Sequence, residues 1–176
     1  MRHVFLINPH AGKQDQTARI RALADRLAAA HNLDCRCLLT DRPGGAEVLS
    51  RALAETGEPV RIYACGGDGT LNEVVNGAAS FDNAAVTCVP KGTGNDFLKL
   101  FGPNYRSIFS NLEALAAGPQ AAFDLMDCNG KLGLDVVCAG VDARIAADVH
   151  RYKDWRFLSG KGAYIVSLVE NILFKG

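Results

Sequence analysis

The chain has 176 residues, a net charge of zero and an apolar content of 48%. That length suits one well-buried domain, or one domain with part of another, and the charge balance argues against a general nucleic-acid binder. The six cysteines form no CxxC pair and have no histidine at zinc-ligand spacing. We therefore expect buried, reduced thiols in a cytoplasmic protein.

Apolar runs alternate with helical periodicities over the first two thirds of the chain. The runs lack polar alternation, which is typical of parallel strands buried on both faces. The predicted strands are residues 3–7, 34–39, 59–65 and 84–89. The predicted helices are residues 14–31, a segment that begins near Pro43, residues 70–79, a short turn after Asp96, and residues 108–117. Residues 1–118 are therefore predicted to form an α/β domain with three layers and a parallel sheet.

The pattern changes after Gly118. Two short runs flank Asn129-Gly130, which is a strong hairpin signal, and residues 141–150 and 162–174 have helical periodicity. A two-stranded hairpin is marginal alone. Residues 119–176 are therefore predicted to be the start of a truncated, β-rich second domain.

Glycine-bearing loops follow three of the predicted strands, at residues 8–13, 66–70 and 91–96. Ligands of an open parallel sheet bind beyond the carboxyl ends of the strands, so these loops are expected to share one rim. Glycine backbones and the start of a helix suit phosphate groups. Asp68 would repel a bare phosphate, so it predicts either a bridging Mg²⁺ or a proton acceptor for an attacking hydroxyl.

Plainer interpretations of the same loops remain open. Thr70 and Glu73 have the spacing of a capping box for the helix that follows. Asn76-Gly77 is typical of a helix end, and Asn95 or Asp96 is expected to cap the next helix. The sequence contains no GxxxxGK[ST], GxGxxG or GxSxG motif.

Five stretches, in this order, resemble the diacylglycerol kinase catalytic-domain family. They are NPHAG at 8–12, GGDGTLNEVVNG at 66–77, PKGTGNDF at 90–97, FDLMD at 123–127 and CAGVDARIA at 138–146. GGDGT alone is shared with NAD kinases, whereas GTGNDF with the leading NPxxG points to the lipid-kinase branch. The sphingosine-kinase branch is similar but usually varies the end of GGDGT.

The resemblance implies an ATP site between the α/β domain and a β-sandwich. It implies transfer of the γ-phosphoryl of Mg-ATP to a hydroxyl of diacylglycerol or a similar lipid, with Asp68 as the catalytic residue and Asp68 and Asp124 as the Mg²⁺ residues. The residues implied to contact ATP are Asn8, Pro9, His10, Ala11, Gly12, Thr40, Gly67, Asp68, Gly69, Thr70, Leu71, Asn72, Glu73 and Thr93.

The family's D-G-E segment, with the base for the lipid hydroxyl, would lie beyond Gly176. We therefore expect these 176 residues to bind nucleotide without turnover. A sphingoid-base or NAD kinase on the same scaffold is the alternative.

The expected partner is a lipid at the inner membrane surface, with peripheral contact, and no nucleic acid. The apolar run of residues 163–174 contains Glu170 and Asn171 and is shorter than the roughly 20 residues that span a bilayer. Cations interleave with aromatic residues just before it, which suits an anionic membrane surface, although a solvated connection is an equal alternative. These residues are Arg151, Lys153, Trp155, Arg156, Phe157 and Lys161.

Overall fold

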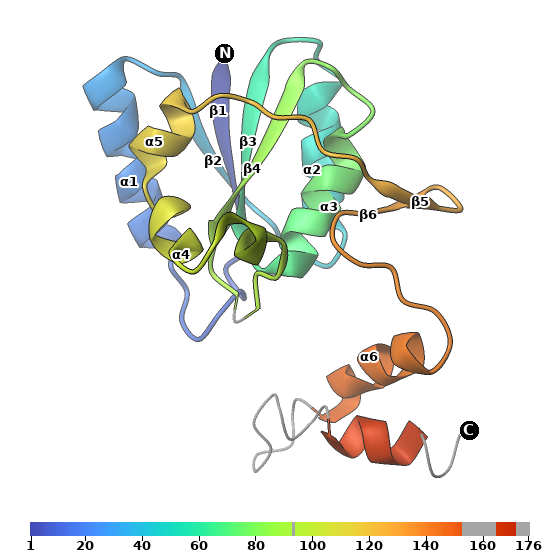
Figure 1. Cartoon of the computed structure of the whole chain (residues 1–176). Coiled ribbons are helices and arrows are strands. Elements are labelled where there is room, and N and C mark those ends of the chain that lie inside the picture. The colour runs from blue at the N-terminus through green and yellow to red at the C-terminus, as the bar shows by residue number, and fades with distance from the viewer. Residues whose placement is uncertain (93, 153–164, 172–176) are drawn as a thin grey trace. The chain divides into compact units, whose positions relative to one another are not determined.

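The computed structural model describes residues 1–92, 94–152 and 165–171, which fall into two compact units, residues 1–135 and 136–176. The first unit is an α/β/α sandwich (Figure 1). Its sheet consists of β1 (Arg2–Ile7), β2 (Cys35–Leu39), β3 (Val60–Gly66) and β4 (Ala84–Pro90). All neighbouring strands are parallel, in the order β2-β1-β3-β4. The predicted α/β fold with a parallel sheet is confirmed, and each strand lies within one residue of its predicted bounds.

Helices cover both faces of this sheet (Figure 1). On one face, α1 (Thr17–His31) and α5 (Leu112–Ala117) pack on alternate residues of the central strands, including Phe5 and Tyr63. On the other face, α2 (Gly45–Ala54) and α3 (Asp68–Ala78) pack on the intervening residues, including Leu6 and Ile62. The absence of polar alternation in these strands therefore reflects burial on both sides.

The chain between β4 and α5 differs from its prediction. A 3₁₀ helix, η1 (Phe97–Phe101), and a short α4 (Tyr105–Ile108) precede α5. The predicted helix over residues 108–117 is broken because Asn111 caps α5, its side-chain oxygen accepting the N–H of Ala114 at 3.1 Å.

Arg61 is the only charged residue of β3, and it is buried at 8% exposure. Its guanidinium donates to the carbonyls of Leu115, Ala116 and Gly118, so it satisfies the C-terminal end of α5. The apparent exception in an apolar strand is thus the residue that fixes a helix on the sheet.

The predicted hairpin is present but short. It pairs β5 (Met126–Cys128) with antiparallel β6 (Lys131–Gly133), and its turn residues Asn129 and Gly130 both have positive φ, at 51° and 80°. Such backbone angles match a type I′ turn. The hairpin belongs to the first compact unit. A second domain that begins at residue 119 stays a prediction.

In the second unit, α6 (Val141–Tyr152) and a helix over residues 165–171 are described. The hydroxyl of Ser167 donates to the carbonyl of Ile145 at 2.8 Å, and Asn171 donates to the carboxylate of Asp148 at 2.9 Å. Within the described ranges, no helix is long and apolar enough to cross a bilayer. Most of the predicted cationic and aromatic stretch, from Lys153 to Lys161, lies outside those ranges.

All six cysteines are free. Those on β3 and β4, Cys65 and Cys88, are buried, and burial raises the pKa of Cys88 to about 12. The prediction of buried thiols is wrong for Cys128 and Cys138, which are exposed because they lie on or after the short hairpin rather than in the sheet.

Candidate functional site

The candidate site lies at the carboxyl edge of the sheet, where the strand order reverses. The chain moves from β1 outward to β2 and then crosses back to β3 on the other side of β1. Ligands of doubly wound sheets bind in the crevice at such a switch point. The loops that follow β1, β3 and β4 all emerge at this edge, at the bottom of the view in Figure 1.

Asn8 fixes the loop after β1. Its side-chain oxygen accepts the N–H of His10 at 3.0 Å, and its backbone N–H donates to the carbonyl of Cys65 at 3.0 Å. Its side-chain amide also donates to the hydroxyl of Thr70 at 3.1 Å. One residue therefore ties the first loop to both β3 and α3.

Glycines bring the three loops into direct backbone contact. A Cβ added at Gly92 would lie 2.6 Å from the Cα of Gly67, and one added at Gly94 would lie 2.7 Å from the carboxylate of Asp68. Gly12 has a φ of 84°, and a Cβ there would overlap the carbonyl oxygen of Lys91. Gly12 and Gly92 are thus required for the loops to meet, because the atoms that a side chain would overlap there belong to the backbone.

The predicted capping box is wrong. Helix α3 begins at Asp68, with Gly67 at its N-cap and no side-chain cap, so Thr70 is already inside the first turn, where it is buried. Glu73 does not reach back to its own helix. Its carboxylate accepts the N–H groups of Gly44 and Ala46 at 3.0 and 3.1 Å and caps α2 instead.

Asp68 is exposed, and its carboxylate holds the third loop. Its two oxygens accept the backbone N–H groups of Asn95 at 2.7 Å and Asp96 at 2.6 Å. Asp96 occupies the N-cap position of η1, as predicted for Asn95 or Asp96, but its side chain makes no capping hydrogen bond. Asn95 instead adopts a positive φ of 55° and donates from its side chain to the carbonyl of Gly92 at 2.7 Å.

The start of α3 offers donors that the helix does not use. Its first hydrogen bond joins the N–H of Leu71 to the carbonyl of Gly67 at 3.1 Å, so the N–H groups of Asp68, Gly69 and Thr70 have no intrahelical partner. The helix dipole adds positive potential at the same point. This arrangement suits the oxygens of a phosphate group.

Gly69 differs from the other glycines of the three loops because no close contact requires it to be a glycine. It lies in the helix, its φ is not positive, and a Cβ added to it would meet no atom within 4 Å. Glycine costs up to about 1 kcal/mol relative to alanine in a helix, and less in the first turn, where Gly69 lies. Because the fold gives no reason for that cost, the open space above Gly69 points to a ligand that approaches the backbone.

The other residues implied as ATP contacts are placed as follows. Thr40 is buried, and its backbone N–H donates to the carbonyl of Ile7 at 2.9 Å, while the side chain of Leu71 lies in the core. His10 and Asn72 are exposed, and Pro9 and Ala11 are half-buried. Thr93 lies outside the described residues.

Lys91 joins the first and third loops. Its ammonium donates to the side-chain oxygen of Gln16 at 2.8 Å, and burial, with the nearby Arg19 guanidinium, lowers its pKa. The ammonium group of Lys91 therefore lies beside the N-terminus of α1, hydrogen-bonded to Gln16.

The acids available for a magnesium ion are few. Asp124 is exposed and makes no hydrogen bond with Asp68, and in the part of the chain that is described no three His, Cys, Asp or Glu residues gather as a metal cluster. Mg²⁺ commonly uses one or two carboxylates together with substrate phosphates and water. Each oxygen of Asp68 has a lone pair beyond the N–H bond that it accepts, so the residues fit a magnesium ion that arrives with a nucleotide.

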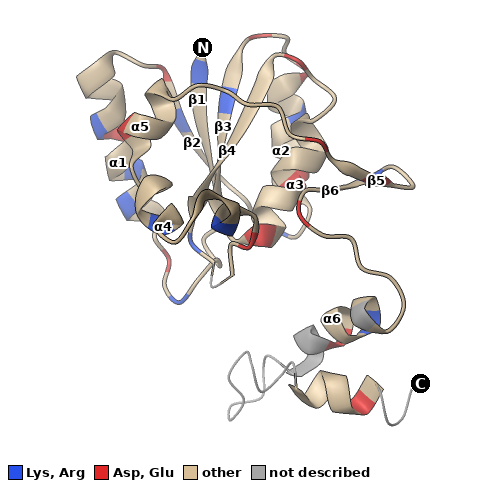
Figure 2. Cartoon of the chain, in the orientation of Figure 1, with Lys and Arg blue, Asp and Glu red and all other residues tan. Residues whose placement is uncertain are grey.

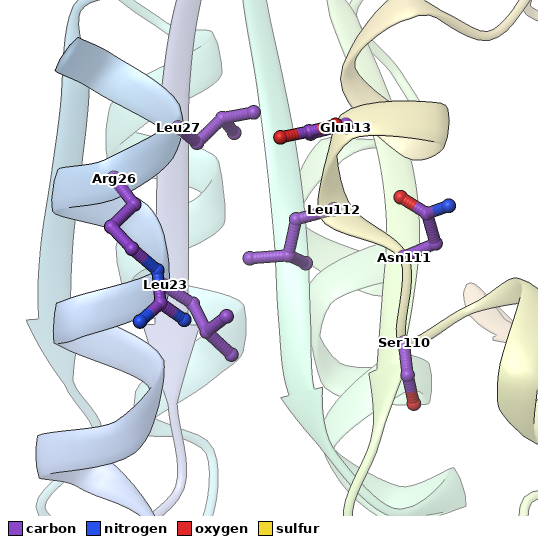
Figure 3. Close-up of a pocket in the computed structure, with 7 residues that line it drawn as sticks. All are labelled: Leu23, Arg26, Leu27, Ser110, Asn111, Leu112 and Glu113. Carbon is purple, nitrogen blue, oxygen red and sulfur yellow. The ribbon is translucent and has the colours of Figure 1, made fainter. Parts of the chain in front are cut away.

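Charges of both signs are interspersed over the α/β unit (Figure 2). A separate pocket lies between α1 and α5, where Leu23, Leu27 and Leu112 point inward beside Arg26 and Glu113 (Figure 3). Its volume of about 230 Å³ is below the roughly 300–1,000 Å³ typical of ligand pockets, and none of the three loops lines it. The loops are therefore the stronger candidate.

Known proteins are similar to this chain in sequence and in fold. A family model described as the diacylglycerol kinase catalytic domain matches residues 2–128. The chain is 32% identical over 157 residues to "Probable lipid kinase YegS-like" of Pseudomonas syringae pv. syringae, which covers 88% of this chain and 49% of that protein. It is 28% identical over 172 residues to "Sphingoid long chain base kinase 4" of Schizosaccharomyces pombe, which covers 93% of this chain and 37% of that protein.

A crystal structure of a diacylglycerol kinase from Bacillus anthracis str. Sterne superposes with a TM-score of 0.60 at 27% identity, over 74% of this chain and 48% of that one. The chain thus spans about half the length of these relatives, or less. Since the family model covers well over half of the residues, the chain belongs to the diacylglycerol kinase catalytic-domain family, whose named relatives are lipid kinases.

Proposed function

We propose that this chain forms the ATP-binding part of a lipid kinase, which transfers the γ-phosphoryl of Mg-ATP to a hydroxyl of diacylglycerol or a similar lipid. Family membership supports a kinase that uses ATP. The observation that carries the proposal is the start of α3, where unused N–H donors surround a glycine that the fold does not require.

Each part of the site has a role in this proposal. The N–H groups at the start of α3 bind phosphate oxygens, and Asn8 and the loop glycines keep the three loops in register around them. The carboxylate oxygens of Asp68 accept two N–H groups of the third loop and have further lone pairs, which would bind the magnesium ion. Asp124 would be a second magnesium ligand. When bound, that ion neutralises phosphate charge. Phosphoryl transfer then depends mainly on positioning and charge neutralisation.

A sphingoid base is the second candidate acceptor. It is favoured by the similarity to "Sphingoid long chain base kinase 4", which extends over 93% of the chain. NAD is a weaker candidate because only GGDGT supports it. Two of the solved relatives carry the name diacylglycerol kinase, which is why diacylglycerol is placed first.

Nucleotide binding by the 176-residue chain tests the site. We expect Mg-ATP to bind the wild-type chain, and Gly69→Ala to weaken binding at least tenfold while thermal stability stays equal or rises. Ala79→Val enlarges an exposed residue at the opposite end of α3 and serves as the control with unchanged binding. Wild-type affinity in Gly69→Ala would contradict the proposed phosphate position.

The acceptor is tested with the natural protein in which these residues occur. Label from γ-labelled ATP is expected in dispersed diacylglycerol. Label in sphingosine or NAD alone would overturn the choice of substrate. Transfer by the isolated 176 residues would refute the proposal that they bind nucleotide without turnover.

A further inference from the structure

Asn76 joins helix α3 to the β5–β6 hairpin. Its side-chain oxygen accepts the backbone N–H of Leu132 at 2.9 Å, and its side-chain amide donates to the carbonyl of the same residue at 2.9 Å. The second amide hydrogen satisfies the carbonyl of Asn72, also at 2.9 Å. The carboxamide thus pairs with β6 as a neighbouring strand would.

No other side chain of this length can make all three bonds. Aspartate lacks the donors, serine and threonine carry one hydroxyl, and glutamine is longer by a methylene. The sequence pattern predicts instead that Asn76-Gly77 ends the helix, but α3 continues to Ala78. A different constraint explains the glycine at position 77, because a Cβ there would lie 2.9 Å from the backbone nitrogen of Arg51 on α2.

The hairpin also has a polar contact with α2, and it is weak. Lys131 lies 3.4 Å from the carboxylate of Glu47, and its side chain is 73% exposed. Exposed ion pairs contribute at most about 1 kcal/mol. Asn76 is therefore the main polar anchor of the hairpin.

The segment before the hairpin is held at a second point, next to the candidate site. The ring of Phe123 packs edge-on against Phe97 and Phe101, with distances between ring centroids of 5.5 Å and 6.2 Å. Phe97 directly follows Asp96, whose N–H is bound by Asp68. Leu125, directly after Asp124, also packs against the core. Asp124 thus lies between two apolar contacts, and the anchor of the hairpin on α3 follows further along the chain.

Helix α3 connects the anchor at Asn76 to the site. Asn76 follows Asp68 by eight residues in one continuous helix, which corresponds to a rise of about 12 Å. We infer that Asn76 is a positioning residue, which docks the β5–β6 hairpin on α3 and thereby sets the place of Asp124 beside the nucleotide site. The inference rests on the proposed function, in which Asp124 serves the magnesium ion.

Hydrogen exchange and nucleotide binding together test this role. The variants are Asn76→Ala, Asn76→Asp and Asp124→Ala, the double variant Asn76→Ala/Asp124→Ala, and Lys131→Ala as the control. The two readouts are the exchange rate of the Leu132 amide and the ratio of ATP affinities with Mg²⁺ and with EDTA.

We expect Asn76→Ala to speed Leu132 exchange about tenfold, because it removes the acceptor of that N–H. Asn76→Asp keeps an acceptor for the N–H but lacks both donors, so it should speed the exchange less than Asn76→Ala does. Asn76→Ala should lower the Mg²⁺-dependent gain in affinity to the level of Asp124→Ala and leave the affinity in EDTA unchanged. The double variant should show no further loss, because both changes remove the same contribution. Lys131→Ala should leave both readouts near wild type.

Several results overturn the inference. Wild-type protection of Leu132 in Asn76→Ala excludes docking, and an unchanged Mg²⁺-dependent gain excludes positioning. Additive losses in the double variant also exclude positioning, because they show that Asn76 acts apart from Asp124. If the wild-type chain binds no ATP, the proposed function and the positioning of Asp124 fail together, and Leu132 exchange alone then decides whether Asn76 docks the hairpin.

Discussion

The carboxylate of Glu73 on α3 accepts the N–H of Gly44 at 3.0 Å and so caps a different helix from its own. Its second oxygen accepts the N–H of Ala46 at 3.1 Å. Charged acceptors at a helix N-terminus also gain from the helix dipole. These two hydrogen bonds hold the loop after β2, which contains Thr40, against α3, the helix whose N-terminus forms the candidate phosphate site.

We predict that Glu73→Ala lowers the free energy of unfolding by about 1–3 kcal/mol, because it leaves two half-buried N–H groups without an acceptor. Urea denaturation measures the change. Glu55→Ala is the matched control, since Glu55 is exposed at the end of α2 and its side chain makes no hydrogen bond or ion pair with the rest of the described chain. For Glu55→Ala we expect the free energy of unfolding to change by less than about 0.5 kcal/mol, as is usual for surface substitutions. Equal effects in both variants would show that the cap contributes nothing.

Gly77→Ala is predicted to destabilise the chain by about 1–3 kcal/mol, as overpacking of a close contact does. The added Cβ would overlap Ser50 and the carbonyl of Glu47, so α2 and α3 would have to separate. The change in Tm and in urea midpoint measures the effect. Gly69→Ala, in the same helix but in open space, should instead stabilise the chain by up to about 1 kcal/mol.

These interactions also mark what the sequence predicts well and what it misses. The strands were predictable because buried parallel strands carry continuous apolar runs, and the three loops because glycines follow those runs. At the candidate site, the features that the sequence misses are hydrogen bonds between distant residues. Glu73 and Gly44 are 29 residues apart, Asp68 and Asn95 are 27 apart, and Asn76 and Leu132 are 56 apart.

Local spacing explains why the capping box was predicted wrongly. Thr70 and Glu73 match the motif, but the helix starts two residues before Thr70, so the hydroxyl pairs with Asn8 and the carboxylate with α2. Nothing local in the sequence distinguishes these partners. An acid between loop glycines was the available signal for Asp68, whereas Asn76 was interpreted as part of a helix end.

Stability is predicted to fall as the pH drops below about 6.5, the usual pKa of histidine. Burial and the neighbouring Arg61 lower the pKa of His3, whose Nδ1 lies 2.8 Å from the hydroxyl of Tyr63, while Asp34 opposes the shift weakly. The unfolded chain therefore binds a proton at a pH where the folded chain does not. The stability is complete above the unfolded pKa and is lost as the pH falls from there to the lower, folded pKa.

Urea denaturation between pH 7.5 and 5.5 measures this slope, which is expected to be at most about 1.4 kcal/mol per pH unit for one group. His3→Gln should flatten it. His10→Gln removes an exposed histidine of the first loop and should keep the wild-type slope. If His3→Gln also keeps that slope, the pH dependence arises elsewhere.

Asp68→Asn is predicted to weaken nucleotide binding at least tenfold while leaving the sheet intact. The sequence predicts for Asp68 a role with Mg²⁺ or as a proton acceptor. The structure adds a local consequence, because the two oxygens of Asp68 hold the N–H groups of Asn95 and Asp96. Asparagine keeps one acceptor and turns an N–H₂ group toward the other donor, so the third loop should loosen.

Hydrogen exchange at Asn95 and Asp96 and calorimetry with Mg-ATP separate the two effects of this change. Faster exchange at both amides, weaker binding by at least tenfold, and unchanged exchange in β1 and β3 are expected. Asp41→Asn is the control, since Asp41 is an exposed acid after β2 whose nearest cation, Arg42, lies 3.9 Å away. Wild-type binding in Asp68→Asn with a loosened loop would show that the carboxylate orders the loop but serves neither phosphate nor magnesium.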